Sequence, residues 1–166
     1  MIKSAQYWID KLKMQPHPEG GYFKEVYRAD EQYNGEYLPD RFGGDRSYGT
    51  SIYFLLIGEQ VSKFHRIKSD EIWHFYEGSP VKIYRISLDG NKKEVVVGRD
   101  PDKGENLQTV IDKGDWFGAE VLDKNSYSLC GCTVAPGFHF EDFELADSSL
   151  LLRQFPQYTK IILKLT

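Results

Sequence analysis

Cysteine and histidine are scarce in this chain, which has 2 cysteines and 4 histidines among 166 residues. Cys130 and Cys132 are separated by one residue in a strand-like segment, so their side chains should point to the same face. A disulfide between them would need strained geometry, and a zinc site would need further thiolates or imidazoles nearby in the sequence. We therefore interpret both cysteines as small buried strand residues.

Long apolar runs and clusters of positive charge are also lacking. The longest apolar run, residues 52–57, is far too short to span a bilayer, and the first residues show no apolar region of a signal peptide. The formal net charge is −4 and no Lys/Arg cluster stands out, which makes nucleic acids and anionic membrane surfaces poor partners. The sequence thus predicts a cytoplasmic protein with no nucleic-acid and no membrane partner.

Many short apolar segments of alternating character are present instead, separated by turn residues. Such a pattern predicts an all-β fold, either a sandwich or a barrel. At this length we expect a single domain over residues 1–166, with the barrel at about 20–145. The predicted strands are residues 22–28, 50–57, 60–67, 71–76, 81–87, 94–98, 107–111, 116–121, 126–135 and 138–143.

Minor helices are expected at both termini. Ser4 is a suitable N-cap for a helix over residues 4–13, in which apolar side chains recur with helical spacing. Asp147 is a suitable cap for a helical tail over residues 147–166, interrupted at Pro156. Between the first helix and the main strands, polar residues 30–47 are predicted to form a long loop, which is a candidate lid over the barrel.

One stretch carries a spacing with chemical meaning. His65 is followed by Glu71 and then by Gly78, which resembles the first motif of the cupin superfamily, H-x-H-x3-E-x6-G. The resemblance implies that, in metal-bearing cupins, two histidines and the glutamate coordinate one metal ion inside a small barrel. Here Ile67 occupies the second histidine position, and an apolar side chain cannot bind a metal.

The second cupin motif is weaker still. The segment IDKGDWFG aligns best with P-x-G-x-x-H, with Gly114 matching and Phe117 in the histidine position. One histidine and one carboxylate make a poor metal site, since a usable site normally has three or more protein ligands. We therefore predict no metal and no other cofactor. If a metal were bound, the ligands would be His65, Glu71 and His139.

Further blocks resemble one cupin branch, the cupin-5 or DUF985 family of uncharacterised RmlC-like cupins. The resemblance rests on HPEGG at 17–21, TSIYFLL at 50–56, FHRIKSDEIWHFYEG at 64–78, YSLCGCTVAPGF at 127–138 and EDFELA at 141–146. It implies a double-stranded β-helix, or jelly-roll barrel, that usually forms a homodimer and encloses a pocket. It implies no established reaction.

Candidate site residues follow from strand alternation and from this resemblance. His65 is the candidate base, Glu71 would orient it or act as an acid, and Tyr53 would be a partner acid. Glu71 shares a strand face with Trp73 and Phe75, and a carboxylate among aromatic rings must be paired or have a raised pKa. Candidate ligand-binding residues are Glu19, Phe23, Trp73, Phe75, Trp116, Phe117, Phe138 and His139.

The HPEGG block has two interpretations. Its glycines and prolines suit a tight turn, which is the commoner use, while His17 and Glu19 would lie near the barrel mouth. For the whole chain we expect a metal-independent, small-molecule-binding cupin. Whether it turns its ligand over is left open, and the reaction considered is that of an isomerase or epimerase on a sugar or carbonyl compound. A non-catalytic ligand-binding cupin and a metal-dependent oxygenase or isomerase are the alternatives.

Overall fold

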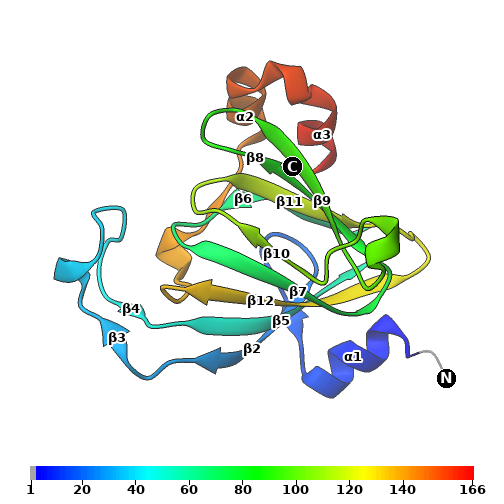
Figure 1. The fold of residues 1–166 in the computed structure, drawn as a ribbon, viewed down its shortest axis with the longest axis horizontal. Helices are drawn as coiled ribbons and strands as arrows, with labels where there is room; N and C mark the ends of the chain where they lie inside the picture. Colours follow the sequence, from blue (N-terminus) through cyan, green and yellow to red (C-terminus); the bar gives the residue numbers. More distant parts are fainter. Residues whose placement is uncertain (1–2) are drawn as a thin grey trace.

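The computed structural model describes residues 3–166 and shows two antiparallel sheets that face each other, with helices on their outer sides (Figure 1). One sheet has the strand order β1-β2-β5-β12-β7-β10 and the other β13-β6-β11-β8-β9, while β3 and β4 pair separately. This arrangement confirms the all-β cupin fold class. The first sheet comprises β1 (Gln15–Pro16), β2 (Tyr22–Arg28), β5 (Thr50–Ile57), β7 (Asp70–Gly78), β10 (Gln108–Ile111) and β12 (Tyr127–Ala135). The second comprises β6 (Val61–Arg66), β8 (Val81–Ile86), β9 (Lys92–Val97), β11 (Trp116–Val121) and β13 (Glu144–Leu145).

The main core lies between the two sheets. Strand side chains alternate between faces, so every second residue of the central strands points inward. Cys130 and Cys132 of β12 are free, buried and part of this core, as expected. The core also contains Phe54, Leu56, Trp73, Val81, Ile83, Val97, Ile111, Phe117, Ala119 and Val121.

Helix α1 (Ala5–Leu12) covers the outer face of the larger sheet (Figure 1). Ser4 caps it by accepting a hydrogen bond from Tyr7 N, and Lys13 ends it with a left-handed conformation. Trp8 and Leu12 pack beneath the helix together with Leu55, Leu129 and Tyr53. The expectation that Tyr53 faces the barrel interior is therefore wrong, because it alternates with the inward Phe54 and shares the face of Leu55.

The C-terminal helices α2 (Ser148–Gln154) and α3 (Thr159–Lys164) cover the outer face of the smaller sheet (Figure 1). Asp147 caps α2 by accepting a hydrogen bond from Leu150 N, as predicted. Trp116 packs in this outer cluster and lies under the Arg66 guanidinium. Its predicted place inside the barrel is wrong, since its neighbour Phe117 takes the inward position. No helix of residues 3–166 is long and apolar enough to cross a membrane.

Two further expectations need correction. Residues 30–47 contain the short strands β3 (Gln32–Tyr33) and β4 (Arg46–Ser47) and project from the side of the molecule, and none of them lines the barrel cavity described below (Figure 1). They are therefore no lid over that cavity. Residues 138–143 are not a strand, because β12 ends before Pro136, which has no N–H to donate, and Phe140–Asp142 form a 3-10 turn.

Docking of the C-terminal helices should contribute strongly to stability. Ile162 of α3 is fully buried, whereas its neighbour Leu163 is 62% exposed. We expect Ile162→Ala to lower the free energy of unfolding by about 2–5 kcal/mol, because it leaves a cavity in the cluster. Leu163→Ala should change it by about 0.5 kcal/mol or less. Urea unfolding of both variants measures the difference, and equal effects would show that α3 is not docked as described.

Candidate functional site

A cavity opens between the ends of β2, β5, β6, β7 and β12, and we call it the barrel cavity. Its volume is about 80 Å³, well below the roughly 300–1,000 Å³ of drug-sized ligand sites, so it suits a small ligand. Its walls are largely apolar, with a few polar and titratable groups. The lining residues are His17, Glu19, Phe23, Glu25, Arg28, Thr50, Ile52, Phe54, His65, Ile67, Glu71, Cys132, Val134, Phe138, Phe140 and Phe143.

The HPEGG turn delivers Glu19 into this cavity. Gly20 has φ of +113°, and a Cβ there would collide with the Val61 carbonyl, so the turn requires glycine. The turn is fixed to β6 because Lys63 N donates to the Glu19 carbonyl at 2.8 Å. The Glu19 side chain then accepts a hydrogen bond from Ser62 Oγ at 2.7 Å. The block therefore forms the expected tight turn, and the same turn places the Glu19 side chain at the cavity.

His65 on β6 contacts Glu19 directly. Its Nε2 lies 3.1 Å from Glu19 Oε2, and its Nδ1 lies 2.7 Å from the Lys63 carbonyl. A carbonyl oxygen can only accept, so Nδ1 carries a hydrogen and donates it. Nε2 and Glu19 Oε2 therefore share a single proton. The ring is held in place by Phe117, whose centroid is 4.1 Å away.

His17 completes this group on the other side of Glu19. Its Nδ1 accepts a hydrogen bond from the Glu19 backbone N–H at 3.4 Å and lies 3.3 Å from Glu19 Oε2. Burial lowers the pKa of His17 to about 4, so the ring is neutral at physiological pH. Its ring lies edge-on to Phe23 and Phe143 at centroid distances of 4.8 and 5.8 Å.

Burial also controls the protonation of the other groups. It lowers the pKa of His65 to about 3, and it raises the pKa of Glu19 well above its ordinary value, reinforced by the nearby Glu71 carboxyl. Within residues 3–166, no Lys or Arg forms an ion pair with Glu19. The shared proton therefore resides on Glu19, which donates it to a neutral His65 at neutral pH.

Glu71 at the start of β7 is buried and lines the same cavity. Burial raises the pKa of Glu71 to about 7, although the neighbouring Cys132 thiol and Trp73 indole act to lower it. The Trp73 Nε1–H has no hydrogen-bond partner of normal geometry among the described residues, so it contacts Glu71 only loosely. Glu71 is thus the group whose proton is most easily gained and lost near neutral pH.

The structure brings some predicted residues together and separates others. Phe23 and Phe138 line the barrel cavity with Glu19, His65 and Glu71. Trp73 and Phe75 share the inward face with Glu71, as expected, but they pack in the core beyond the cavity wall. His139 is half-exposed, and its Nδ1 accepts a hydrogen bond from Glu141 N at 3.2 Å, so it points away from the cavity.

Several lining residues were missed by the sequence analysis. They are Glu25, Thr50, Ile52, Phe54, Val134, Phe140 and Phe143, together with Cys132, which was assigned only to the core. The alternation of residues 50–57 carried a usable signal, because Thr50 and Ile52 share the inward face of Phe54. No sequence pattern pointed to Phe140 and Phe143, because they lie in or next to an irregular turn.

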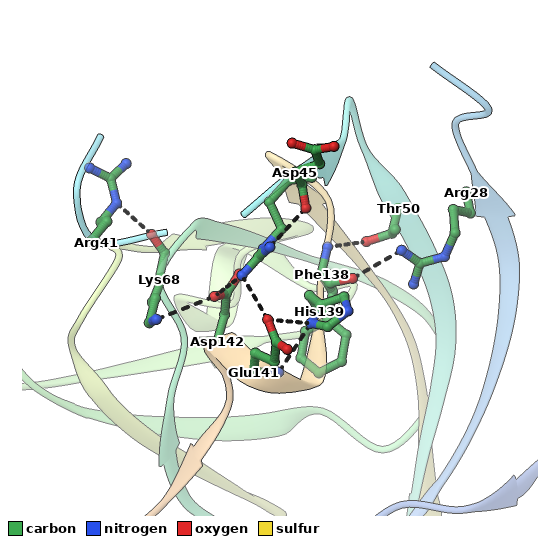
Figure 2. Close-up of polar contacts among 10 residues, drawn as sticks. Arg28, Arg41, Asp45, Thr50, Lys68, Phe138, His139, Glu141 and Asp142 are labelled. Carbon is green, nitrogen blue, oxygen red and sulfur yellow. Dashed lines mark hydrogen bonds and ion pairs between the residues drawn. The ribbon is translucent and has the colours of Figure 1, made fainter. Parts of the chain in front are cut away.

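The mouth segment, residues 136–143, borders the cavity and is anchored at both ends (Figure 2). Thr50 Oγ1 accepts a hydrogen bond from Phe138 N at 2.9 Å, and Arg28 donates to the Phe138 carbonyl at 3.1 Å. At the other end, the buried Arg46 donates to both carboxylate oxygens of Asp142, at 2.6 and 2.7 Å. These anchors hold Phe138, Phe140 and Phe143 at the cavity entrance.

The donor set does not fit the metal that many cupins carry. Residues 3–166 contain no group of three or more His, Cys, Asp or Glu side chains arranged to hold a metal ion. Ile67 lines the cavity in the position of one expected ligand, and Phe117 packs on the His65 ring in the position of another. His65 Nε2 is also engaged by Glu19. No step below is assigned to a metal.

Comparisons with known proteins agree with this architecture. Residues 6–146 match the family described as "Cupin superfamily (DUF985)". An uncharacterized protein of Saccharomyces cerevisiae, YML079W, is 31% identical over 150 residues, covering 84% of this chain and 73% of that protein. The crystal structure of protein SO0799 from Shewanella oneidensis has 36% identity and a TM-score of 0.89, covering 99% of this chain and 98% of that one.

A more distant structural likeness concerns the fold alone. Oxalate decarboxylase from Bacillus subtilis has 14% identity and a TM-score of 0.56, and the match covers 91% of this chain but only 36% of the larger protein. Its activity therefore says nothing direct about the barrel cavity of this chain.

The raised pKa of Glu71 predicts a pH-dependent stability. An unfolded glutamate titrates near 4.5 and folded Glu71 near 7, so the stabilising contribution of its proton is complete below 4.5 and lost as pH rises through 7. Glu71→Gln has no such loss. Its free energy of unfolding should therefore rise relative to wild type by roughly 3 kcal/mol between about pH 4 and pH 8.

Denaturant unfolding at several pH values measures this difference. His17 and His65 have lowered pKa values and contribute stability that is lost as pH falls, but they are present in both proteins and cancel. Glu59→Gln, at an exposed turn, is the matched control and should follow wild type at every pH. A Glu71→Gln difference that stays flat with pH would contradict the assigned pKa.

Proposed function

The chain belongs to the DUF985 family of the cupin superfamily, and we propose that it binds a small carbonyl compound in the barrel cavity and moves protons on it without a metal. The observation that carries this proposal is the gathering of Glu19, His65 and Glu71 in one apolar cavity without a cationic partner. Buried acids without a compensating charge cost stability, and such arrangements cluster at functional sites.

The charge state of the cavity favours a neutral ligand group. A protonated carboxyl can donate a hydrogen bond to a carbonyl oxygen, whereas a carboxylate ligand beside Glu19 and Glu71 would meet further acidic oxygens. The apolar walls formed by Phe23, Ile52 and Ile67 suit the carbon skeleton next to the carbonyl.

Glu71 is the group we assign to proton transfer. A general acid or base works best when its pKa is close to the operating pH, and the pKa of Glu71 is about 7. It would remove a proton from the carbon beside the carbonyl and return it, which is the elementary step of isomerases and epimerases. Glu19, fixed by the hydrogen bond from Ser62, would turn its single O–H from His65 Nε2 to the carbonyl oxygen of the ligand, where negative charge develops.

Tyr53 is replaced in this account. It was the predicted partner acid, but it lies on the outer face of the larger sheet against α1. Glu19 takes that role, because it is the neutral acid that contacts His65. His65 then orients Glu19 by accepting a hydrogen bond from its O–H until a ligand takes that hydrogen bond, rather than acting as an independent base.

A homodimer and a cytoplasmic location, both expected from the sequence, stay predictions. In support of a second copy, residues 24–28 of β2 pair with β5 and with no other strand among residues 3–166, and Val26 and Tyr27 on this edge are 51% and 57% exposed. The mass of the particle in solution tests this expectation against the 19.2 kDa of one chain.

Hydrogen exchange in D₂O tests the proposed chemistry. Three- to six-carbon aldehydes, ketones and hydroxycarbonyls are incubated with the protein, and loss of the proton signal beside the carbonyl is followed by NMR. We expect catalysed exchange with at least one compound, and Glu71→Gln should slow it by about 100-fold or more. Glu59→Gln should retain the wild-type rate.

The outcomes separate the candidate functions. Exchange that persists in Glu71→Gln would contradict the role given to Glu71. Binding without exchange, seen as line broadening of the carbonyl compound, would contradict catalysis and support the ligand-binding alternative. Absence of both would contradict a carbonyl ligand altogether.

A further inference from the structure

The cavity mouth narrows the class of ligand further. We propose that the carbonyl compound carries a carboxylate at its far end and that Arg28 binds this carboxylate, so that the ligand is a short oxo acid. This inference rests on the proposed function, because it places the carbonyl beside Glu19 and Glu71. It assigns to Arg28 a role in specificity.

Strand register places Arg28 opposite the reacting end of the cavity. Arg28 of β2 pairs with Thr50 of β5, Thr50 with Val134 of β12, and Val134 with Glu71 of β7. Arg28 and Glu71 thus lie in one row across the sheet, and their backbone positions are separated by three strand spacings, or roughly 14 Å. Both line the same cavity. A ligand between them meets an acid at one end and a cation at the other.

The middle of that row is apolar or neutral. Val134 and Thr50 lie between the two charged ends, and Ile52 lies in the next row of the wall. The Arg28 guanidinium reaches from β2 over the mouth toward Phe138, and Figure 2 shows it directed at the Phe138 carbonyl. Because the side chains of Arg28 and Glu71 both extend into the cavity, the space left between them suits a ligand with a short carbon chain.

The present partner of Arg28 is easily replaced. Arg28 pairs with Glu25 through two hydrogen bonds of 2.7 and 3.1 Å, but the two side chains are 42% and 40% exposed. An exposed ion pair of this kind is worth about 0–1 kcal/mol. A ligand carboxylate can therefore displace Glu25 at little cost, while the hydrogen bond to Phe138 keeps the guanidinium in place.

The guanidinium groups of two other arginines already form ion pairs within the protein. Arg46 is buried and its guanidinium is taken by Asp142, and Arg85 is bound to Asp112 and Asp115. Among the lining residues in the described chain, Arg28 is the only Lys or Arg. A single guanidinium matches one carboxylate in its two-pronged geometry, whereas a phosphate dianion usually requires additional positive charge.

A matched pair of probes tests this inference. 2-Pentanone and 4-oxopentanoate share a methyl ketone on a five-carbon chain and differ in the terminal carboxylate, and their affinities are measured by NMR titration at low salt. We expect wild type to bind 4-oxopentanoate at least ten-fold more tightly than 2-pentanone. Arg28→Gln should bring this ratio close to one, and Arg28→Lys should restore part of it.

Substitution of Glu25, the ion-pair partner of Arg28, should change the affinity ratio of the two probes in the opposite direction. Glu25→Gln removes the competing carboxylate, so the ratio should rise above that of wild type. Arg66→Gln is the control, because Arg66 forms a similarly exposed ion pair with Glu144 outside the cavity, and it should keep the wild-type ratio. Ratios that shift equally in Arg28→Gln and Arg66→Gln would overturn the role of Arg28.

The results also distinguish this inference from the proposed function. If wild type binds 4-oxopentanoate and 2-pentanone with nearly equal affinity, the carboxylate site at Arg28 is wrong, while binding of the carbonyl group in the cavity is supported. If neither probe binds, the proposed function fails and the inference fails with it. A high ratio that Arg28→Gln leaves unchanged would place the anion site elsewhere.

Discussion

The structure of the site depends on one constraint, which is that two glutamates and two histidines are buried in an apolar barrel without a cation to neutralise them. Glu19 can remain there only as a neutral acid, so its O–H must donate a hydrogen bond to a neighbour, and His65 Nε2 is placed to accept it. The His65 tautomer follows from its bond to the Lys63 carbonyl. The HPEGG turn and the apolar residues Ile67 and Phe117 are consistent with this requirement, because the turn positions Glu19, and the two apolar side chains surround the acids with apolar surface.

This constraint also connects the site to its chemistry. Metal ligation uses deprotonated carboxylates and free imidazole nitrogens, whereas here His65 Nε2 is engaged by Glu19, and the apolar Ile67 and Phe117 occupy the positions of two expected ligands. A neutral acid beside an acid with a pKa of about 7 is suited to proton transfer at a carbonyl, as in enzymes that keep one carboxyl protonated for hydrogen bonding. Among the described lining residues, positive charge is confined to the mouth, where Arg28 is paired with the half-exposed Glu25, while the acids inside have no such partner.

The sequence predicted the fold and part of the site, and the failures have physical causes. Alternation and turn residues were enough to place most strands. The His65, Glu71 and Gly78 spacing identified β6 and β7, two consecutive strands in opposite sheets that both contribute to the cavity. Alternation shows which side chains share a face but not which face is inside, and that is why Tyr53 was misplaced. Trp116 and Phe117 are consecutive and could not both face inward. The contact between Glu19 and His65 joins two distant segments through a turn, and no local pattern encodes it.

Carbon NMR of the glutamate side chains tests the central claim most directly. With glutamate labelled at Cδ, the carboxyl signals of wild type, Glu19→Gln and Glu71→Gln are followed as pH is raised. The account predicts one signal that titrates at about pH 7 and is missing in Glu71→Gln. It predicts another that remains protonated well above the normal range and is missing in Glu19→Gln. If every glutamate titrated in the ordinary range near 4.5, the pair of buried acids without an ion-pair partner would be wrong.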